Sequence, residues 1–114
     1  MSMKQLLTVT LVLASFAAHG QGQVVSQAYE LDLSNFRAPT TANSSAAFKQ
    51  CDECDQQRVR VTESTSYSVN GKRVRLDDFR KAVSQSRDRD RDGKTVILLH
   101  HLESDTVVSI DVSL

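Results

Sequence analysis

The chain has 114 residues, equal numbers of basic and acidic side chains, no Trp, and only four Phe and two Tyr. This length fits one small domain. Nucleic-acid binding needs a basic excess or a set of stacking aromatic rings, and the chain has neither. We therefore expect no nucleic-acid partner.

The N-terminal residues 1–20 have the pattern of a secretory signal peptide. Lys4 precedes an apolar run from Leu6 to Ala18, and Ala18 and Gly20 have the small-residue spacing of a processing site. The run is about thirteen residues long, whereas a membrane-spanning helix needs ~20. Cleavage there also removes Lys4 and leaves one net negative charge. The sequence predicts a periplasmic or secreted protein with no membrane span after processing.

Residues 21–50 are predicted to form an N-terminal extension. Apolar and polar residues alternate from Tyr29 to Leu33, the period of a half-buried strand. The segment Ala38–Ala47 is small and polar without apolar periodicity, which favours a flexible linker. The folded β-domain is then expected over residues 51–114.

A β-hairpin is the clearest local element of that domain. The segments Tyr67–Val69 and Val74–Leu76 flank Asn70-Gly71, a pair that accepts positive φ and is typical of a two-residue turn. Such a turn pairs Tyr67 with Val74 across the two strands. Val59 and Val61 indicate a further strand before the hairpin.

A short helix and two more strands are expected after the hairpin. Asp77 or Asp78 is predicted to cap the helix, with Phe79 on its apolar side. Thr95–Leu102 is apolar on both faces, which is typical of a central strand covered on both sides. Alternation over Val108–Leu114 predicts the last strand.

These elements have the order βββαββ, which indicates a mainly β (α+β) fold. Five strands and one helix can form a small twisted sheet or an OB-like barrel. We expect the barrel, because closure hides the edges that a short open sheet exposes.

The run Thr65–Phe79 reads Thr-Ser-Tyr-Ser-Val-Asn-Gly-Lys-Arg-Val-Arg-Leu-Asp-Asp-Phe and is followed by two predicted strands. In this it resembles small exported bacterial domains of unknown function with OB-like β-barrels. The resemblance implies a bacterial host and a barrel fold. It implies no particular activity, because one fold serves many functions.

Cys51 and Cys54 are the only cysteines. In an oxidising compartment the expected state is a disulfide that closes the loop Cys-Asp-Glu-Cys. A redox-active dithiol is the alternative, but Asp52, Glu53 and Asp55 disfavour the thiolate on which redox chemistry depends. We therefore expect a structural disulfide.

An acidic loop, Asp88–Gly93, has part of a calcium-binding pattern. Asp88, Asp90 and Asp92 are spaced as the first ligands of such a loop, and glycine follows at its sixth position. The twelfth position, where a bidentate acid is needed, is Leu99. We expect a solvated loop of alternating charge, and calcium binding stays the alternative.

A softer metal site is a second alternative. His100 together with Cys51 and Cys54 would give a zinc or copper site of mixed nitrogen and sulfur ligands. His100 and His101 are adjacent on a predicted strand, so their side chains point to opposite faces. One histidine in the sheet interior and one in solvent is the expectation that we prefer.

The sequence contains no nucleophile elbow, zinc-protease helix or phosphate-binding glycine loop. We therefore predict a non-enzymatic exported module that binds or assists an unknown envelope or extracellular protein. The alternatives are a metal-binding protein and a thiol-disulfide redox protein.

Overall fold

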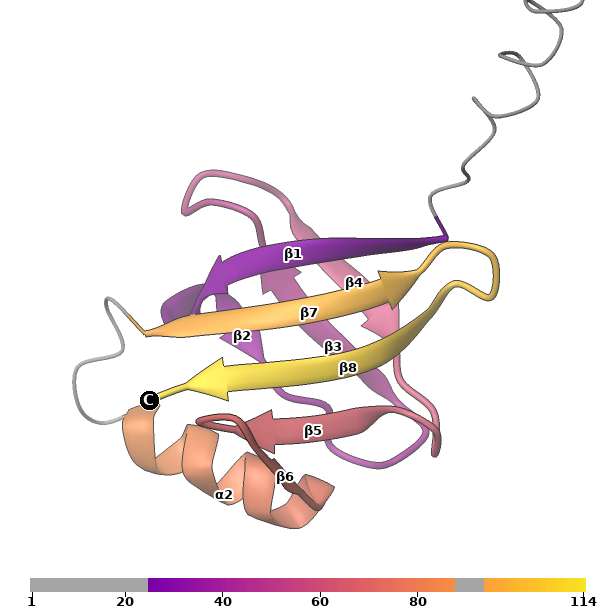
Figure 1. Ribbon diagram of the computed structural model, residues 1–114. Coiled ribbons are helices and arrows are strands. Elements are labelled where there is room, and N and C mark those ends of the chain that lie inside the picture. Colours follow the sequence, from indigo (N-terminus) through magenta and orange to yellow (C-terminus); the bar gives the residue numbers. More distant parts are fainter. Residues whose placement is uncertain (1–24, 88–93) are drawn as a thin grey trace, which may run out of the picture.

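The computed structural model describes residues 25–87 and 94–114. The predicted signal peptide and the acidic loop with Asp88, Asp90 and Asp92 lie outside the described residues. Within them, eight strands form one mixed sheet, accompanied by one 3-10 helix and one short α-helix (Figure 1). In chain order the elements are β1 (Ser26–Asp32), η1 (Leu33–Asn35), β2 (Phe36–Arg37), β3 (Ser45–Lys49), β4 (Gln56–Arg60), β5 (Ser66–Val69), β6 (Lys72–Val74), α2 (Leu76–Arg87), β7 (Thr95–His101) and β8 (Thr106–Ser113).

Six strands of the sheet have the order β1-β7-β8-β4-β3-β2. The other two, β5 and β6, lie off this path: β5 pairs with β8 and with β6. The β8 strand is antiparallel to β7 and parallel to both β4 and β5. The sheet is strongly curved, so that β2, β3 and β4 lie behind β1, β7 and β8 (Figure 1). Rings from the two halves meet in the core, where Tyr29 of β1 lies 5.0 Å from Phe48 of β3.

The predicted closed barrel is wrong, because the sheet stays open. Among the described strands, β1 pairs only β7 and β2 pairs only β3, so the ends of the strand order do not meet. Helix α2 lies against the core: the Phe79 ring is 6.3 Å from Phe36 of β2 and 5.1 Å from Tyr67 of β5. The predicted five strands are also too few, although the order βββαββ holds from β4 to β8.

The prediction of a flexible linker over Ala38–Ala47 is wrong. This segment runs into β3, which pairs β2 and β4 and places Ala46 and Phe48 in the buried core. Phe36 is the register partner of Phe48, and both side chains are buried in the core. Small residues carry little periodic signal, which is why β3 is missed in the sequence pattern.

The predicted hairpin is confirmed. Tyr67 pairs with Val74, and both turn residues are left-handed, with φ 53° at Asn70 and 82° at Gly71. The turn is also held from outside the hairpin. The Asn70 amide donates to the Val112 carbonyl at 2.8 Å, and its side-chain oxygen accepts from the Leu114 amide at 2.7 Å.

The predicted cap at Asp77 or Asp78 is wrong, because α2 begins at Leu76. Both aspartates lie in its first turn instead. The Phe79 amide donates to the Arg75 carbonyl at 2.9 Å, which places Arg75 before the first helical residue. Carboxylates in the first turn still stabilise a helix through its dipole.

Strand β7 lies between β1 and β8, as predicted for a central strand. Val96 and Leu98 are fully buried, but Ile97 on the other face is 45% exposed. The expectation that both faces are covered is therefore wrong. One face of β7 builds the core, and the other faces solvent.

Replacing Phe79 tests whether α2 is part of the core. We expect Phe79→Ala to lower the free energy of unfolding by about 3–5 kcal/mol, because it removes a fully buried ring and leaves a cavity. Phe79→Leu should cost less. Urea denaturation measures both changes, with the exposed Lys81→Ala as control. A loss below about 1 kcal/mol for Phe79→Ala would contradict the packing described.

Candidate functional site

Cys51 and Cys54 form a disulfide in the connection between β3 and β4. The Cys54 amide donates to the Cys51 carbonyl at 3.1 Å, so the bridge closes a tight turn. The loop also contacts η1, because the side-chain amide of Asn35 donates a hydrogen bond to the Asp52 carboxylate at 2.9 Å. The disulfide joins residues only three apart, so it stabilises this corner locally.

The structure does not bring the candidate soft-metal ligands together. The disulfide loop lies just before the first residue of β4. His100 lies near the last residue of β4, because Arg60 there pairs with Thr106, and Thr106 is next to the register partner of His100. The two ends of β4 are roughly 13 Å apart at the usual rise per residue of a strand. Within residues 25–87 and 94–114, no three His, Cys, Asp or Glu side chains are grouped as metal ligands.

Removing the disulfide should have a modest effect on stability. We expect the double variant Cys51→Ser/Cys54→Ser to unfold with about 2 kcal/mol less free energy, because so short a loop restricts the unfolded chain only slightly. Urea denaturation measures the difference. Reduced wild-type protein is the control and should match the variant. Identical midpoints for the variant and the oxidised protein would contradict this role.

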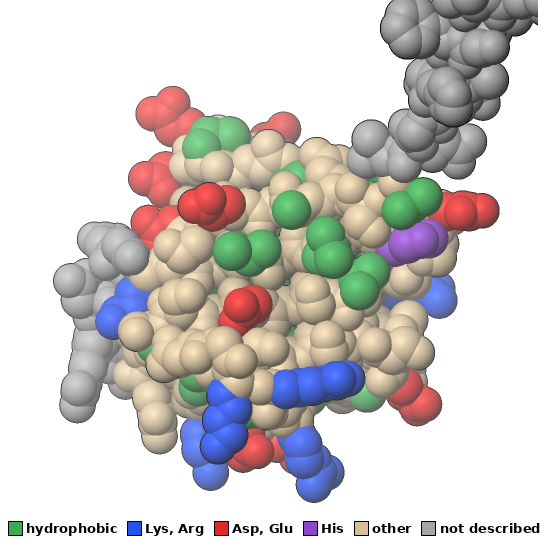
Figure 2. Space-filling model, viewed as in Figure 1, with side chains coloured by type: hydrophobic (Ala, Val, Ile, Leu, Met, Phe, Trp, Pro, Cys, Tyr) green, Lys and Arg blue, Asp and Glu red, His purple; other side chains and the backbone are tan. Residues whose placement is uncertain are grey.

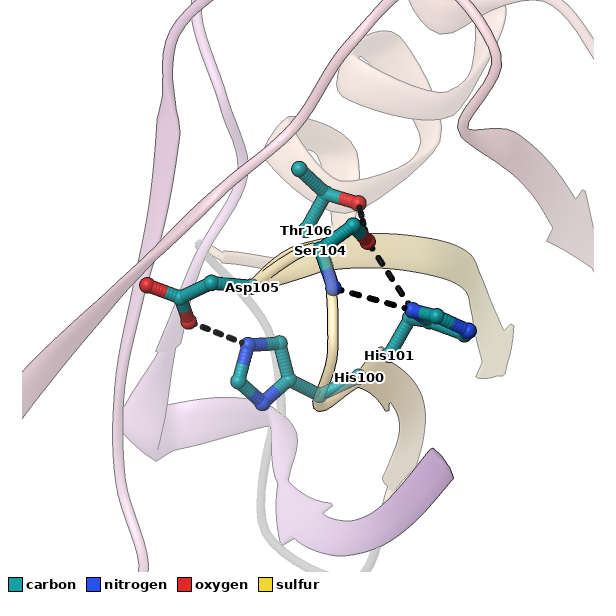
Figure 3. Close-up of polar contacts among 5 residues, drawn as sticks. All are labelled: His100, His101, Ser104, Asp105 and Thr106. Atoms are coloured by element: carbon teal, nitrogen blue, oxygen red, sulfur yellow. Dashed lines mark hydrogen bonds and ion pairs between the residues drawn. The ribbon is translucent and has the colours of Figure 1, made fainter. Parts of the chain in front are cut away.

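The two histidines lie at the turn between β7 and β8, on opposite faces of the sheet (Figure 3). His100 pairs with buried Val107, and its side chain is 12% exposed. Its Nε2 contacts the Asp105 carboxylate at 2.8 Å, at a turn residue with φ 56°. This contact fixes the turn, while the buried Nδ1 of His100 has no hydrogen-bond partner.

His101 makes a local set of contacts on the other face. The Ser104 amide donates to its Nδ1 at 3.2 Å, and the Ser104 hydroxyl lies 3.0 Å from the same nitrogen (Figure 3). The Ser104 and Thr106 hydroxyls are 2.7 Å apart. Nδ1 of His101 therefore acts as an acceptor, which places the proton of the neutral ring on Nε2. Both histidines have a structural part in the turn.

The solvent-facing side of β1, β7 and β8 carries a set of apolar side chains that are exposed, except for the half-buried Leu99. Ala28, Ile97 and Leu99 alternate with core residues on β1 and β7, and Val108 lies at an irregularity in the β7–β8 register. At one end, Val25 and Leu102 are joined by a backbone hydrogen bond of 2.9 Å. We call this set the outer surface: Val25, Ala28, Ile97, Leu99, Leu102 and Val108.

Acidic residues border the outer surface. Glu30 and Asp111 are the two register partners of Ile97, and Asp32 follows on β1. One carboxylate oxygen of Asp111 is covered and has no hydrogen-bond partner. The strands β1, β7 and β8 contain no Lys or Arg. Figure 2 shows the apolar side chains gathered on this face with acidic groups beside them and basic groups towards the lower edge.

The sequence pattern misses the outer surface for a physical reason. A strand that is apolar on both faces indicates a covered strand, and nothing local to β7 shows that one face stays open. The sign that this face is open lies on the neighbouring strands β1 and β8, where Glu30 and Asp111 place polar groups beside Ile97. That signal needs the strand register, which the sequence alone does not supply.

No protein-family model, curated protein or solved structure matches this chain. Within the described residues, no helix has both the length and the hydropathy of a membrane span.

Proposed function

We propose that this protein is an exported, non-enzymatic binding module of the cell envelope that docks a partner protein on its outer surface. The observation that carries the proposal is the exposure of large apolar side chains on one sheet face. Ile97 is 45% exposed, Leu102 42% and Val108 39%. Grouped apolar side chains on a folded surface are typical of protein-binding sites.

Charge specifies the kind of partner. Glu30, Asp32 and Asp111 border the outer surface, and its strands supply no cation. A partner surface with apolar side chains surrounded by Lys and Arg therefore complements the outer surface in both hydropathy and charge.

The export part of the proposal rests on the leader. Lys4, the apolar run Leu6–Ala18 and the small residues at its end match a signal peptide. The Cys51–Cys54 disulfide is consistent with an oxidising compartment.

Site-specific photocrosslinking in the cells that encode the protein tests the docking. A photoreactive residue at position 97 or 108 of the full chain should give the same discrete adduct, whereas position 57 on β4 should not. The linked partner peptide should contain apolar residues next to Lys or Arg, and the intact mass should show a chain that begins near Gln21. Equal adducts at all three positions, or none, would contradict the proposal.

Charge reversal then tests complementarity with the purified partner. We expect Glu30→Lys to weaken binding about tenfold at low salt and less at high salt, because screening reduces attraction at an interface rim. Glu53→Lys on the disulfide loop makes the same charge change away from the outer surface and should leave affinity unchanged. Equal effects of the two variants would count against the outer surface as the docking site.

A further inference from the structure

Strand β1 is an edge strand of the sheet. Within the described residues it pairs only with β7, along all seven residues from Ser26 to Asp32. Figure 1 shows it at the border of the β1-β7-β8 group. The side of such a strand that faces away from the sheet carries main-chain N–H and C=O groups that another extended chain can pair. We call this side the open edge of β1.

The register identifies the main-chain groups on the open edge. At one end of β1, the Leu102 amide donates to the Val25 carbonyl at 2.9 Å. At the other end, the Leu33 amide donates to the Lys94 carbonyl at the same distance. Hydrogen-bonded and non-hydrogen-bonded pairs alternate along an antiparallel ladder. The odd-numbered residues of β1 therefore bond to β7, and the main-chain groups of the even-numbered residues point to the open edge.

Ala28 and Glu30 are the central even-numbered residues of β1. Both are exposed. Their main-chain groups have no backbone hydrogen bond to a turn or loop within the part of the chain that the structure describes. Two donors and two acceptors at the middle of the strand are therefore available to an added strand.

β1 lacks the features that protect the other strands with a single pairing partner. These are β2 and β6 among the described strands. β2 has two residues and includes Arg37, and β6 has three residues and includes Lys72 and Arg73. Short length and edge charges, of Lys above all, hinder pairing with another chain. β1 has seven residues and contains no Lys, Arg or Pro. Its edge is therefore the one best suited to pairing.

The two faces of β1 specify the side chains of an added strand. On the face that continues the outer surface, the carboxylates of Glu30 and Asp32 outnumber Lys94, which lines a pocket with them. On the inner face, Tyr29 is half-buried and its ring lies 5.0 Å from Phe48. Directly opposite residues of antiparallel strands share a face. A complementary strand therefore alternates basic side chains opposite the carboxylates with apolar side chains beside Tyr29.

A second copy of this chain fits the open edge less well. Two antiparallel β1 strands would bring Glu30 and Asp32 of both copies to one junction, and β1 contains no cation to balance them. Like charges close together in a sheet are destabilising. The edge therefore favours a different chain with basic side chains.

We propose that the partner adds an extended segment of alternating basic and apolar residues to the open edge of β1. The segment runs antiparallel to β1, because antiparallel pairing is the more stable arrangement. Strand addition of this kind obtains its affinity from main-chain hydrogen bonds and its specificity from alternate side chains. The inference rests on the proposed docking function and names the part of the partner that binds.

Amide hydrogen exchange of the purified protein with a model peptide tests the edge. The probe is acetyl-Lys-Val-Lys-Val-Lys-Val-Lys-amide, and the same peptide with Glu in place of Lys is the control. We expect the amides of Ala28 and Glu30 to exchange at least about tenfold more slowly with the lysine peptide, because pairing protects them, and no change with the control. Unchanged rates at the highest peptide concentration would overturn the proposal. Protection that rises with protein concentration without peptide would assign the edge to a second copy and would also overturn it.

Two N-methylated peptides test the backbone pairing on unaltered protein. In the antiparallel arrangement, the peptide residues opposite Ala28 and Glu30 are lysines, and their N–H groups point to β1. N-methylation of the two central lysines should therefore weaken binding about tenfold, because two hydrogen bonds are lost. N-methylation of two valines should have little effect, because their N–H groups point away from β1. Equal losses with the two peptides would refute antiparallel strand addition.

A proline variant tests the same edge from the side of the protein. Ala28→Pro removes an N–H that bonds to no strand of the sheet, and proline is tolerated at such edge positions. We expect its urea midpoint to stay close to that of the wild type, while peptide binding weakens about tenfold. Ala28→Thr keeps the N–H and should bind like the wild type. Equal affinities of the two variants would contradict the role of the edge.

The same variants distinguish failure of the edge from failure of docking. If photocrosslinking at positions 97 and 108 identifies a partner and Ala28→Pro captures it as well as Ala28→Thr does, the edge is refuted and docking at the outer surface stands. If the lysine peptide protects Ala28 and Glu30 but positions 97 and 108 give no adduct, docking at the outer surface is refuted and the edge stands.

Discussion

The pairing of β8 with three strands is the constraint on which the rest of the structure depends. β8 runs antiparallel to β7 along its length and parallel to both β4 and β5. Its inward residues Val107, Ile110 and Val112 are buried in the core. Two hydrogen bonds of Asn70 to the C-terminal end of β8 hold the hairpin turn in place. Without β8, the β5–β6 hairpin would have no strand pairing to the β1–β7 pair, because β5 pairs only β6 and β8 among the described strands.

This arrangement gives each strand of the β1-β7-β8 group two different faces. The inner face packs against the aromatic core, in which Phe79 of α2 lies near Phe36 and Tyr67. The outer face stays in solvent, where an apolar surface lies beside carboxylates. Basic residues lie on β2, β3, β4, β6 and α2, and Lys94 directly precedes β7, where it lines one pocket with Glu30 and Asp32. The fold thus gathers the apolar side chains of the outer surface and their neighbouring carboxylates on one face of the sheet, with no Lys or Arg on β1, β7 or β8.

Local chemistry predicts the hairpin well, because Asn70-Gly71 determines both the turn and the pairing of Tyr67 with Val74. It does not predict β3 or the open sheet. The Phe36–Phe48 pair and the parallel contacts of β8 join residues far apart in sequence, and no local pattern encodes them. The spacing of Cys51 and Cys54, together with the export that the leader predicts, favours the disulfide that the structure contains. The orphan hydroxyl of Tyr67 is not predictable in this way, because it arises only when the core forms around the ring.

Residue-resolved amide hydrogen exchange tests most directly whether β8 holds the sheet together. If it does, the paired amides of β5, β7 and β8 open only in global unfolding and exchange with one common free energy. A β5–β6 unit that opens at a clearly lower free energy, while β7 and β8 stay protected, would contradict this. Hairpin and helix would then form a unit that folds separately from the rest of the sheet.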